Sequence, residues 1–277
     1  MMDSLNKKIE THYLKKGLYE DILVRLKEQN IDLNQVTRHD IAGVDEFHVR
    51  GSEVSKELAS SINIKGSKVL DMGSGIGGPC RMLAHQYDCD TIGIDLSSEF
   101  VKTANALSKL VGLNHKTKFI QGSATALPFD DNSFDVVWTQ HVQMNIPDKQ
   151  KFYGEARRVL KPGGYFLYYD IFTTHVGPIE YPMPWANHES FSFLIGIDEV
   201  ASILNNLGFL KISTTNQTEA GITFFKSLFT KIETSGPPKV SLSLLMGEST
   251  LSKLSNLFSH LQKNLLILES GVYQKTN

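Results

Sequence analysis

The sequence predicts an α/β fold with a mostly parallel sheet and helices on both of its faces. Between residues 68 and 171, short apolar runs alternate with segments of helical periodicity. The first run ends in a glycine-rich turn that joins a strand to a helix, with the sequence Val69-Leu70-Asp71-Met72-Gly73-Ser74-Gly75-Ile76-Gly77. Parallel strands need a crossover between them, so alternation at this spacing indicates a parallel sheet covered by helices.

Helical periodicity also precedes the sheet. Apolar residues recur at helical spacing between residues 3 and 29, where Gly17 divides the segment into two helices, and again between residues 52 and 61. We expect residues 1–64 to form an N-terminal helical cap over the mouth of a ligand site.

The remaining elements follow from the same patterns. The alternating region predicts strands over residues 68–71, 91–95, 117–121, 134–138 and 165–171, and helices over 77–87, 98–111 and 149–160. Residues 172–193 contain three prolines and predict an irregular segment. Then come a helix over 198–207, a strand over 209–215, two helices over 222–232 and 251–265, and a last strand over 265–274.

The glycine turn predicts a nucleotide-like ligand. Glycine at Gly73, Gly75 and Gly77 removes side chains that would block close approach, and the helix that follows directs its free N–H groups into the same crevice. Gly73, Gly75 and Gly78 also fit the dinucleotide pattern of NAD or FAD sites. Asp71 favours another ligand, because a carboxylate there would repel a pyrophosphate and suits a cationic amino group, as at the methionine end of S-adenosylmethionine (SAM). The alternative is a plain strand-end acid.

A second acid follows the next strand. Asp95 stands 20 residues after Gly75, at the position from which a carboxylate accepts hydrogen bonds from both hydroxyls of a ribose. Leu96 is placed to cover a face of an adenine, and Ser97 to cap the helix that follows.

With these residues in place, the chain resembles the class I SAM-dependent methyltransferases, and within them the UbiE-like, small-molecule branch with the methyltransferase type 11 domain. Four segments carry the resemblance in the expected order, at residues 69–77, 93–96, 122–137 and 158–164. It implies a Rossmann-like fold with a mostly parallel seven-stranded sheet. Residues 65–277 would form the SAM-binding domain, the last strand would be antiparallel, and residues 221–264 would be a helical insertion over the acceptor site.

The resemblance also implies roles for residues after the third and fourth strands. The family's acid that bonds the adenine amino group is here Ser123, a departure that a hydroxyl and the Ala124 backbone N–H would serve more weakly. Gln140 and His141 would lie beside the sulfonium methyl. Gln140 is expected to contact the cofactor or orient the acceptor, and His141 to act as a base, to position the acceptor, or to hold the loop.

Other side chains are candidates for the ends of the site. Arg50 would pair with the methionine carboxylate of SAM, or else be a surface cation. His48 is expected to be a packed or capping residue. Tyr181, Trp185 and His188 lie in the irregular segment and would form the acceptor wall, with buried packing as the alternative.

Composition limits the class of protein. The chain has 277 residues, 41% hydrophobic and 21% charged, as in ordinary globular proteins, and a net charge of −2 that gives no basis for nucleic-acid binding. Cys80 and Cys89 are expected to be reduced packing residues without metal-ligand partners, so no metal is expected. No signal peptide or membrane-length apolar run is present, which predicts a cytoplasmic protein without integral membrane association and leaves a homodimer open.

The sequence therefore predicts an enzyme that transfers a methyl group from SAM to a small molecule. The family resemblance implies two acceptor classes, an amine of the sarcosine or dimethylglycine type and a quinol- or lipid-like ring, and leaves both open. The alternatives are an NAD-dependent oxidoreductase and a SAM-binding protein without activity.

Overall fold

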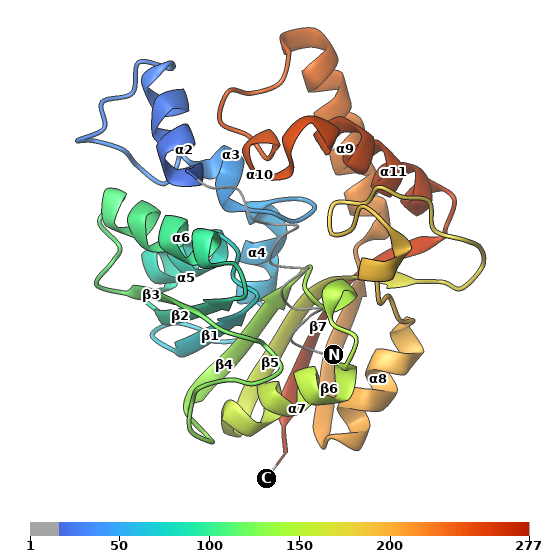
Figure 1. The fold of residues 1–277 in the computed structure, drawn as a ribbon. Helices are drawn as coiled ribbons and strands as arrows, with labels where there is room; N and C mark the ends of the chain where they lie inside the picture. Colours follow the sequence, from blue (N-terminus) through green and yellow to red (C-terminus); the bar gives the residue numbers. More distant parts are fainter. Residues whose placement is uncertain (1–16, 277) are drawn as a thin grey trace.

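The computed structural model describes residues 17–276 and contains one seven-stranded sheet in the order β3-β2-β1-β4-β5-β7-β6 (Figure 1). All pairings from β3 to β5 are parallel, and β7 is antiparallel to both of its neighbours. The strands are β1 (Lys68–Met72), β2 (Asp90–Asp95), β3 (Thr117–Gln121), β4 (Phe134–Gln140), β5 (Leu160–Thr173), β6 (Phe209–Asn216) and β7 (Leu266–Lys275). The predicted sheet and its antiparallel last strand are confirmed.

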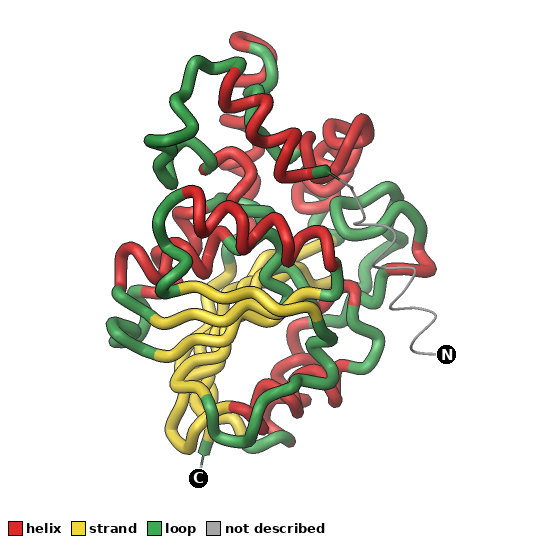
Figure 2. Tube along the Cα trace, turned by 60° about the vertical axis from the view of Figure 1, so that its left-hand side comes forward, coloured by secondary structure: helices red, strands yellow, loops and turns green. Residues whose placement is uncertain are grey.

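Helices cover both faces of this sheet (Figure 2). They are α2 (Leu18–Lys27), α3 (Ala42–Asp45), α4 (Ser52–Ala59), α5 (Gly78–Tyr87), α6 (Ser98–Leu110), α7 (Lys149–Val159), α8 (Ile197–Asn206), α9 (Thr218–Ser235), α10 (Ser243–Met246) and α11 (Thr250–Gln262), with short 3₁₀ turns at Gln143–Asn145, Glu189–Phe191 and Gly247–Ser249. Alternate residues of β4 enter opposite cores. Val136 and Trp138 pack with α4, α5, α9 and α11, whereas Val137 packs with α7 and α8. Burial on both faces explains why the central strands are apolar runs.

Local chemistry fixes where several helices begin. The Ser97 hydroxyl accepts from Phe100 N and caps α6, as predicted, and Asp148 caps α7 by accepting from Lys151 N. Gly77 precedes α5 with φ 87°, and Pro79 stands in the first turn of that helix. Each strand–helix junction at the carboxyl edge is thereby defined within a few residues.

The N-terminal helices pack against two partners that are distant in the chain. Residues of α2 share an apolar cluster with Phe100 and Leu107 of α6 and with Val240 and Leu244 beside and within α10. At α3, a Cβ on Gly43 would lie 2.0 Å from the Val240 carbonyl oxygen. Residues 17–64, which we call the cap, and the helical segment before β7 therefore meet each other above the sheet (Figure 1). The first half of the predicted helical region, residues 3–16, lies outside the described residues.

A few boundaries differ from the predictions. β5 runs on to Thr173 because it pairs with β7 from Tyr165 to Thr173, and α9 begins at Thr218 rather than at residue 222. The irregular segment is confirmed except for that strand end and the 3₁₀ turn at Glu189–Phe191. Among residues 17–276, no helix has both the length and the apolarity required to span a bilayer.

Candidate active site

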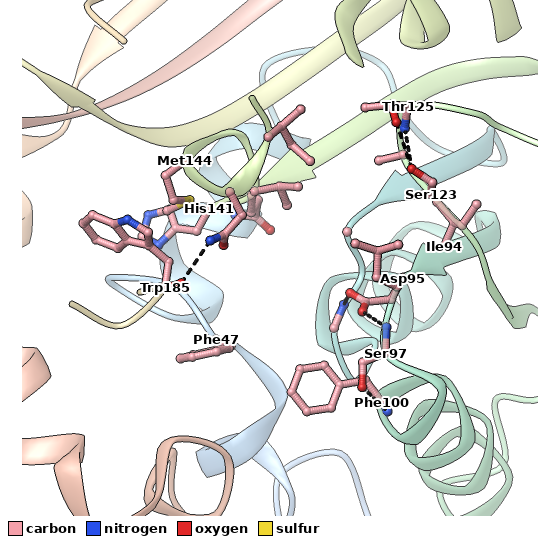
Figure 3. A pocket seen from close by; sticks show the side chains of 18 of the residues that line it. Phe47, Ile94, Asp95, Ser97, Phe100, Ser123, Thr125, His141, Met144 and Trp185 are labelled. Carbon is pink, nitrogen blue, oxygen red and sulfur yellow. Dashed lines mark hydrogen bonds between the residues drawn. The ribbon is translucent and has the colours of Figure 1, made fainter. Parts of the chain in front are cut away.

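One pocket lies beyond the carboxyl ends of β1, β2, β3 and β4 (Figure 3). Asp95, Ser97 and Phe100 line one side of it, and His141, Met144 and Trp185 line the other. The glycine turn after β1 lies between these groups, because β1 is flanked by β2 and β4 in the sheet. This is where open α/β sheets bind ligands.

The glycines of the turn have different functions. Gly75 lines the pocket with φ 54°, and nothing lies within 4 Å of where its Cβ would be, so the turn leaves open space for a ligand. At Gly73, a Cβ would lie 2.4 Å from Val142 Cγ2, and at Gly77 it would lie 2.3 Å from the Phe119 ring. Gly73 lines the pocket and Gly77 does not.

Gly78, which completes the dinucleotide pattern, is explained by packing. A Cβ there would lie 1.7 Å from the backbone carbonyl oxygen of Asp45, at the end of α3. Gly78 is not among the lining residues. The glycine that suggested NAD or FAD therefore allows the cap to approach α5.

Asp95 is held with its carboxylate ready to accept further hydrogen bonds. Oδ2 accepts from Gly75 N and Oδ1 from Ser97 N, each at 2.9 Å. Each oxygen keeps a second lone pair, so the carboxylate can still accept from a diol. Burial raises the pKa of Asp95, and the two backbone hydrogen bonds oppose that rise. Leu96 lines the pocket beside it.

The end of β3 carries the weaker polar contact. Ser123 and Ala124 line the pocket, and the Ser123 hydroxyl accepts from Thr125 N at 3.2 Å and lies 2.9 Å from the Thr125 hydroxyl. The residue that departs from the family's acid is therefore already engaged within its own turn.

Asp71 does not line the pocket. Its side chain shares a sheet face with Val69 and lies against α5, where the Cys80 thiol donates to Asp71 Oδ2 at 3.4 Å. Burial raises the pKa of Asp71 to about 7, opposed by the Cys80 hydrogen bond and assisted by Asp95. Cys80 is thus more than the packing residue expected from the sequence, while Cys89 is likewise a buried, free thiol.

Gln140, at the tip of β4, has a defined orientation. Its Oε1 accepts from Trp138 Nε1 at 2.9 Å and lies 3.2 Å from the Ser55 hydroxyl of α4. With the amide turned the other way, its NH₂ group would face the indole N–H, so that a donor would meet a donor. The Nε2 atom is shielded from solvent and has no hydrogen-bond partner among the described residues.

His141 follows directly with φ 53°, a conformation uncommon for a residue other than glycine. Its backbone N–H donates to the Tyr169 carbonyl at 2.9 Å, and its ring lies 4.9 Å from the Tyr169 ring. Nε2 is shielded and lacks a partner in the described part of the chain. Burial, and secondarily His48, lowers the pKa of His141 well below its usual range, so the ring is neutral at pH 7.

Hydrogen bonds with two buried, ionisable side chains hold the loop that carries His141. Asp170 Oδ2 accepts from the backbone N–H groups of Val142 and Gln143, at 3.3 and 3.2 Å. Buried Lys149 donates to the backbone carbonyls of Gln143, Ile146 and Phe193. These contacts satisfy both donors and acceptors of the 3₁₀ turn that presents Met144 to the pocket.

The cap supplies a buried polar cluster beside Gln140, which we define as Glu46, His48 and Ser55. His48 Nε2 lies 2.9 Å from the Gly51 carbonyl oxygen, which is an acceptor only, so this nitrogen carries the proton. Ser55 Oγ lies 3.1 Å from Glu46 Oε2 and 3.1 Å from His48 Nε2. Burial raises the pKa of Glu46 to about 7 and lowers that of His48 to about 4.

A second buried contact ties the cap to the glycine turn. Arg81 of α5 is 0% exposed and donates to the Asp45 carboxylate from Nη2 and Nε. It also donates to the carbonyls of Ile76 and Ala104. The segment 45–55 is therefore anchored at one end to α5 and at the other to the tip of β4.

Arg50 is placed apart from the pocket. It does not line the pocket, and its two terminal nitrogens donate to the carboxylate of Glu57 at 2.8 and 2.6 Å and to Gln217 Oε1 at 2.8 Å. The side chain is 9% exposed, so Arg50 is a paired, largely buried cation rather than a surface one.

The expected acceptor wall is only partly brought together. Trp185 lines the pocket, with its indole N–H donating to Ser192 Oγ at 2.9 Å. Tyr181 packs against the main core instead, and His188 is exposed. None of the lining residues comes from the helical segment before β7. Phe47 and Met144 complete the wall and were missed from the sequence, although Phe47 stands in the same short segment as His48 and Arg50.

Comparison with known proteins places this geometry in context. Residues 70–168 match the model of a methyltransferase domain family. A sterol 24-C-methyltransferase of Gibberella zeae is 40% identical over 120 residues, 43% of this chain and 32% of that protein. The sarcosine/dimethylglycine N-methyltransferase of Halorhodospira halochloris is 36% identical over 121 residues, 44% of this chain and 42% of that protein. The chain thus spans less than half the length of these two relatives.

Solved structures share the fold across most of the chain. Phosphoethanolamine N-methyltransferase 2 of Haemonchus contortus, solved with SAM, superposes with a TM-score of 0.71 at 19% identity, covering 89% of this chain and 60% of that one. Geranyl diphosphate C-methyltransferase of Streptomyces coelicolor gives a TM-score of 0.67 at 15% identity, covering 81% and 80%. In residues 17–276, no group of three or more His, Cys, Asp or Glu side chains is arranged to hold a metal ion.

Proposed function

Given a methyltransferase domain over residues 70–168 and the fold of the class I SAM-dependent methyltransferases, we propose that this protein transfers a methyl group from SAM to a small-molecule acceptor. The observation that carries the proposal is the Asp95 carboxylate beside the open space over Gly75. A carboxylate with two free lone pairs next to bare backbone suits a ribose diol and a chain that continues across the turn.

The residues present fit such a cofactor. Asp95 and Leu96 would hold the ribose and cover the adenine, and Ser123 with Ala124 would face the adenine edge. Gly73, Gly75 and Gly77 give the turn its shape. Asp71 would act through the turn it supports, because its side chain lies on α5 rather than in the pocket. Bound SAM supplies a methyl group on a good leaving group, so the protein must chiefly align the acceptor.

His141 is proposed as the residue that receives the acceptor's proton. His141 lines the pocket, its ring is neutral at neutral pH, and its Nε2 has no hydrogen-bond partner among the described residues. In the tautomer with the proton on Nδ1, Nε2 is the free acceptor. A base without a competing hydrogen bond can accept a proton from a hydroxyl or amine placed in line with the methyl group. The clamp on its loop by Asp170 and Lys149 keeps it in place.

For the acceptor, we favour an uncharged ring compound with a nucleophilic hydroxyl or carbon, of the quinol- or lipid-like class. The acceptor side of the pocket is made by Phe47, Met144, Pro184 and Trp185. None of the described lining residues is Lys or Arg, so the described wall offers no cation for the carboxylate of a sarcosine-type amine. Trp185 and the neutral His141 suit an apolar ring.

The first test is binding and transfer by the intact protein. We expect SAM and its demethylated product to bind by calorimetry and NAD not to bind. With methyl-labelled SAM, label should appear in the organic-soluble products of a metabolite extract. Strong NAD binding without SAM binding would establish the oxidoreductase alternative. SAM binding without transfer to any fraction would favour a SAM-binding protein without activity.

Variants of His141 test its role. His141→Ala should lower turnover about 100-fold, the order expected for a lost general base, while SAM affinity stays within about twofold. His141→Asn, which keeps a polar side chain at this positive-φ position, controls for loop shape. Equal turnover of the variants and the parent would leave His141 a structural residue.

The partner and compartment predictions extend this proposal. A small-molecule acceptor is the proposed partner, and we retain a cytoplasmic location and an open question of homodimer formation. Light scattering at several protein concentrations measures the assembly state directly, and fractionation of source cells measures the location.

A further inference from the structure

The proposed SAM site leaves one group of the cofactor without a protein partner, the carboxylate of its methionine part. Gln140, which contacts the cluster of Glu46, His48 and Ser55, offers a donor for it. This inference rests on the proposed function. If Asp95 holds the ribose, the nucleoside lies at the tips of β2 and β3, and the rest of the cofactor extends across Gly73 and Gly75 toward the tip of β4. The amino-acid end of SAM, which carries a carboxylate, therefore reaches Gln140.

A carboxylate at that end needs donors. None of the described lining residues is cationic, and the two terminal nitrogens of Arg50 are already engaged by Glu57 and Gln217. Gln140 is 7% exposed, lines the pocket and has an amide nitrogen with no acceptor among the described residues. A buried donor without a partner is costly, and sites that keep one commonly use it for a ligand.

The orientation of that donor is set from two sides. Trp138 Nε1, which is a donor only, fixes Gln140 Oε1 against the indole. Ser55, at 0% exposure on α4, directs its hydroxyl to the same oxygen across 85 positions of sequence. With Oε1 held by both groups, Nε2 is the amide atom left for the pocket.

Ser55 is itself held by its neighbours in the cap. Its hydroxyl can donate one proton, and two acceptor oxygens lie within reach of it, Glu46 Oε2 at 3.1 Å and Gln140 Oε1 at 3.2 Å. His48 donates its Nε2 proton to the Gly51 carbonyl, so this nitrogen, 3.1 Å from Ser55 Oγ, has no lone pair that could accept from the Ser55 hydroxyl. The proton of Ser55 is thereby directed away from His48 and toward Glu46 and Gln140.

We infer that Gln140 Nε2 binds the methionine carboxylate of SAM, and that Ser55 and His48 are positioning residues that hold the Gln140 amide in the required orientation. The cap would thus act on the cofactor through a side chain of the sheet and not through Arg50.

The test compares ligands with and without the carboxylate on matched variants. SAM and decarboxylated SAM are titrated by calorimetry into the parent, Gln140→Glu and Ser55→Ala. Gln140→Glu keeps an acceptor for Trp138 and Ser55 but replaces the free donor by an oxygen. Ser55→Ala removes the hydroxyl oxygen that contacts Gln140 and keeps the Cβ atom of the side chain in place. Tyr169→Phe is the control. It also removes a buried hydroxyl, but this hydroxyl, unlike that of Ser55, has no partner among the described residues, and Tyr169 does not line the pocket.

We expect Gln140→Glu to weaken SAM by about tenfold or more while changing decarboxylated SAM by less than about twofold, because a hydrogen bond to a charged group is the stronger kind. Ser55→Ala should weaken SAM by about threefold to tenfold with the same ligand selectivity, and Tyr169→Phe should change neither ligand. Equal losses for both ligands would show a purely structural role and overturn the inference. Failure of the parent to bind SAM would instead overturn the proposed function.

Discussion

The two ends of the pocket are built in different ways. At the end where we propose that the nucleoside binds, which we call the nucleoside end, the contacts are local. Asp95 accepts from Ser97 N two positions away and from Gly75 N twenty positions away, and Ser123 accepts from its neighbour Thr125. At the cap end, Ser55 meets Gln140 across 85 positions, and Asn145 donates to the carbonyl of Trp185 across 40. The nucleoside end is thus specified by strand tips and turns, and the cap end only by the assembled fold.

The largest expected effect would break the link between these ends. Arg81→Met leaves the buried Asp45 carboxylate without its partner, and we expect the free energy of unfolding to fall by about 3–5 kcal/mol. Urea denaturation measures the loss. Asp45→Asn combined with Arg81→Met removes both charges and should recover a large part of it. A single-variant loss below about 1 kcal/mol would mean that the cap and the glycine turn are held independently.

Asp95 tests the nucleoside end alone. Asp95→Ala removes both acceptors of the proposed ribose contact, and SAM affinity should fall about 100-fold, as expected for the loss of charge-assisted hydrogen bonds. Asp95→Asn, which keeps one acceptor oxygen, should fall less. Calorimetry at pH 7.5 measures both. If decarboxylated SAM loses as much as SAM, the effect belongs to the nucleoside end; a loss confined to SAM would place the carboxylate there and reverse the comparison.

Glu46 tests the cap cluster through its proton. Its folded pKa of about 7 lies above the ordinary value of 4.5, so the folded state keeps the proton longer. The stability this gives is complete below pH 4.5 and is lost as the pH rises through 7. Glu46→Gln should therefore be more stable than the parent at pH 8, by about 1–3 kcal/mol, with a much smaller difference at pH 5.

Comparing variant with parent isolates Glu46 from its neighbours. Asp71 and Asp170, whose pKa values burial also raises to about 7, act in both proteins, and His48, lowered to about 4, acts with the opposite sign as the pH falls below 6.5. A stability difference that is the same at pH 5 and pH 8 would show that Glu46 is ionised throughout this range in the folded protein.

The smallest expected effect tests whether the adenine lies at Ser123. Ser123→Asp would introduce the acid that the family resemblance implies after the third strand, and an Asp can still accept from Thr125 N. We expect SAM to bind about three- to fivefold tighter, since one added hydrogen bond contributes about 1 kcal/mol. Ser123→Asn is the control with the same shape and no charge. Unchanged or weaker binding by the aspartate variant would mean that adenine does not lie at this tip.

Most of the fold could be predicted because its signals are local. The alternation of apolar runs and helices, the glycine turn and the Ser97 cap each lie within a few residues and suffice to place the strands along the sequence. The order of the strands in the sheet was not predicted. The antiparallel last strand came from family resemblance, and β5 was longer than predicted because β7 pairs with it up to Thr173.

The sequence led to residues that line the pocket where the position of a strand tip is enough, as at Asp95 and Gln140, whose roles stay predictions. The sequence did not predict the positions of residues that depend on the direction of a side chain or on a contact between distant parts of the chain. Asp71 stands at a strand end, but its side chain shares the face of Val69 and meets Cys80 on α5. Arg50 precedes α4, whose Glu57 binds it. Ser55 carries no sequence signal beyond a polar position on a helix, since its partner is 85 residues away.

The contact between Gly78 and the Asp45 carbonyl limits how such a protein can be altered. A single added methyl group at Gly78 would collide with the cap backbone, so the turn and the cap form one module in engineering terms. A cap borrowed from a relative with a different acceptor can be grafted only together with its own residue at this position and its own partner for Arg81. An exchange of residues 42–55 therefore has to include the start of α5, because the two segments fit each other closely at Gly78.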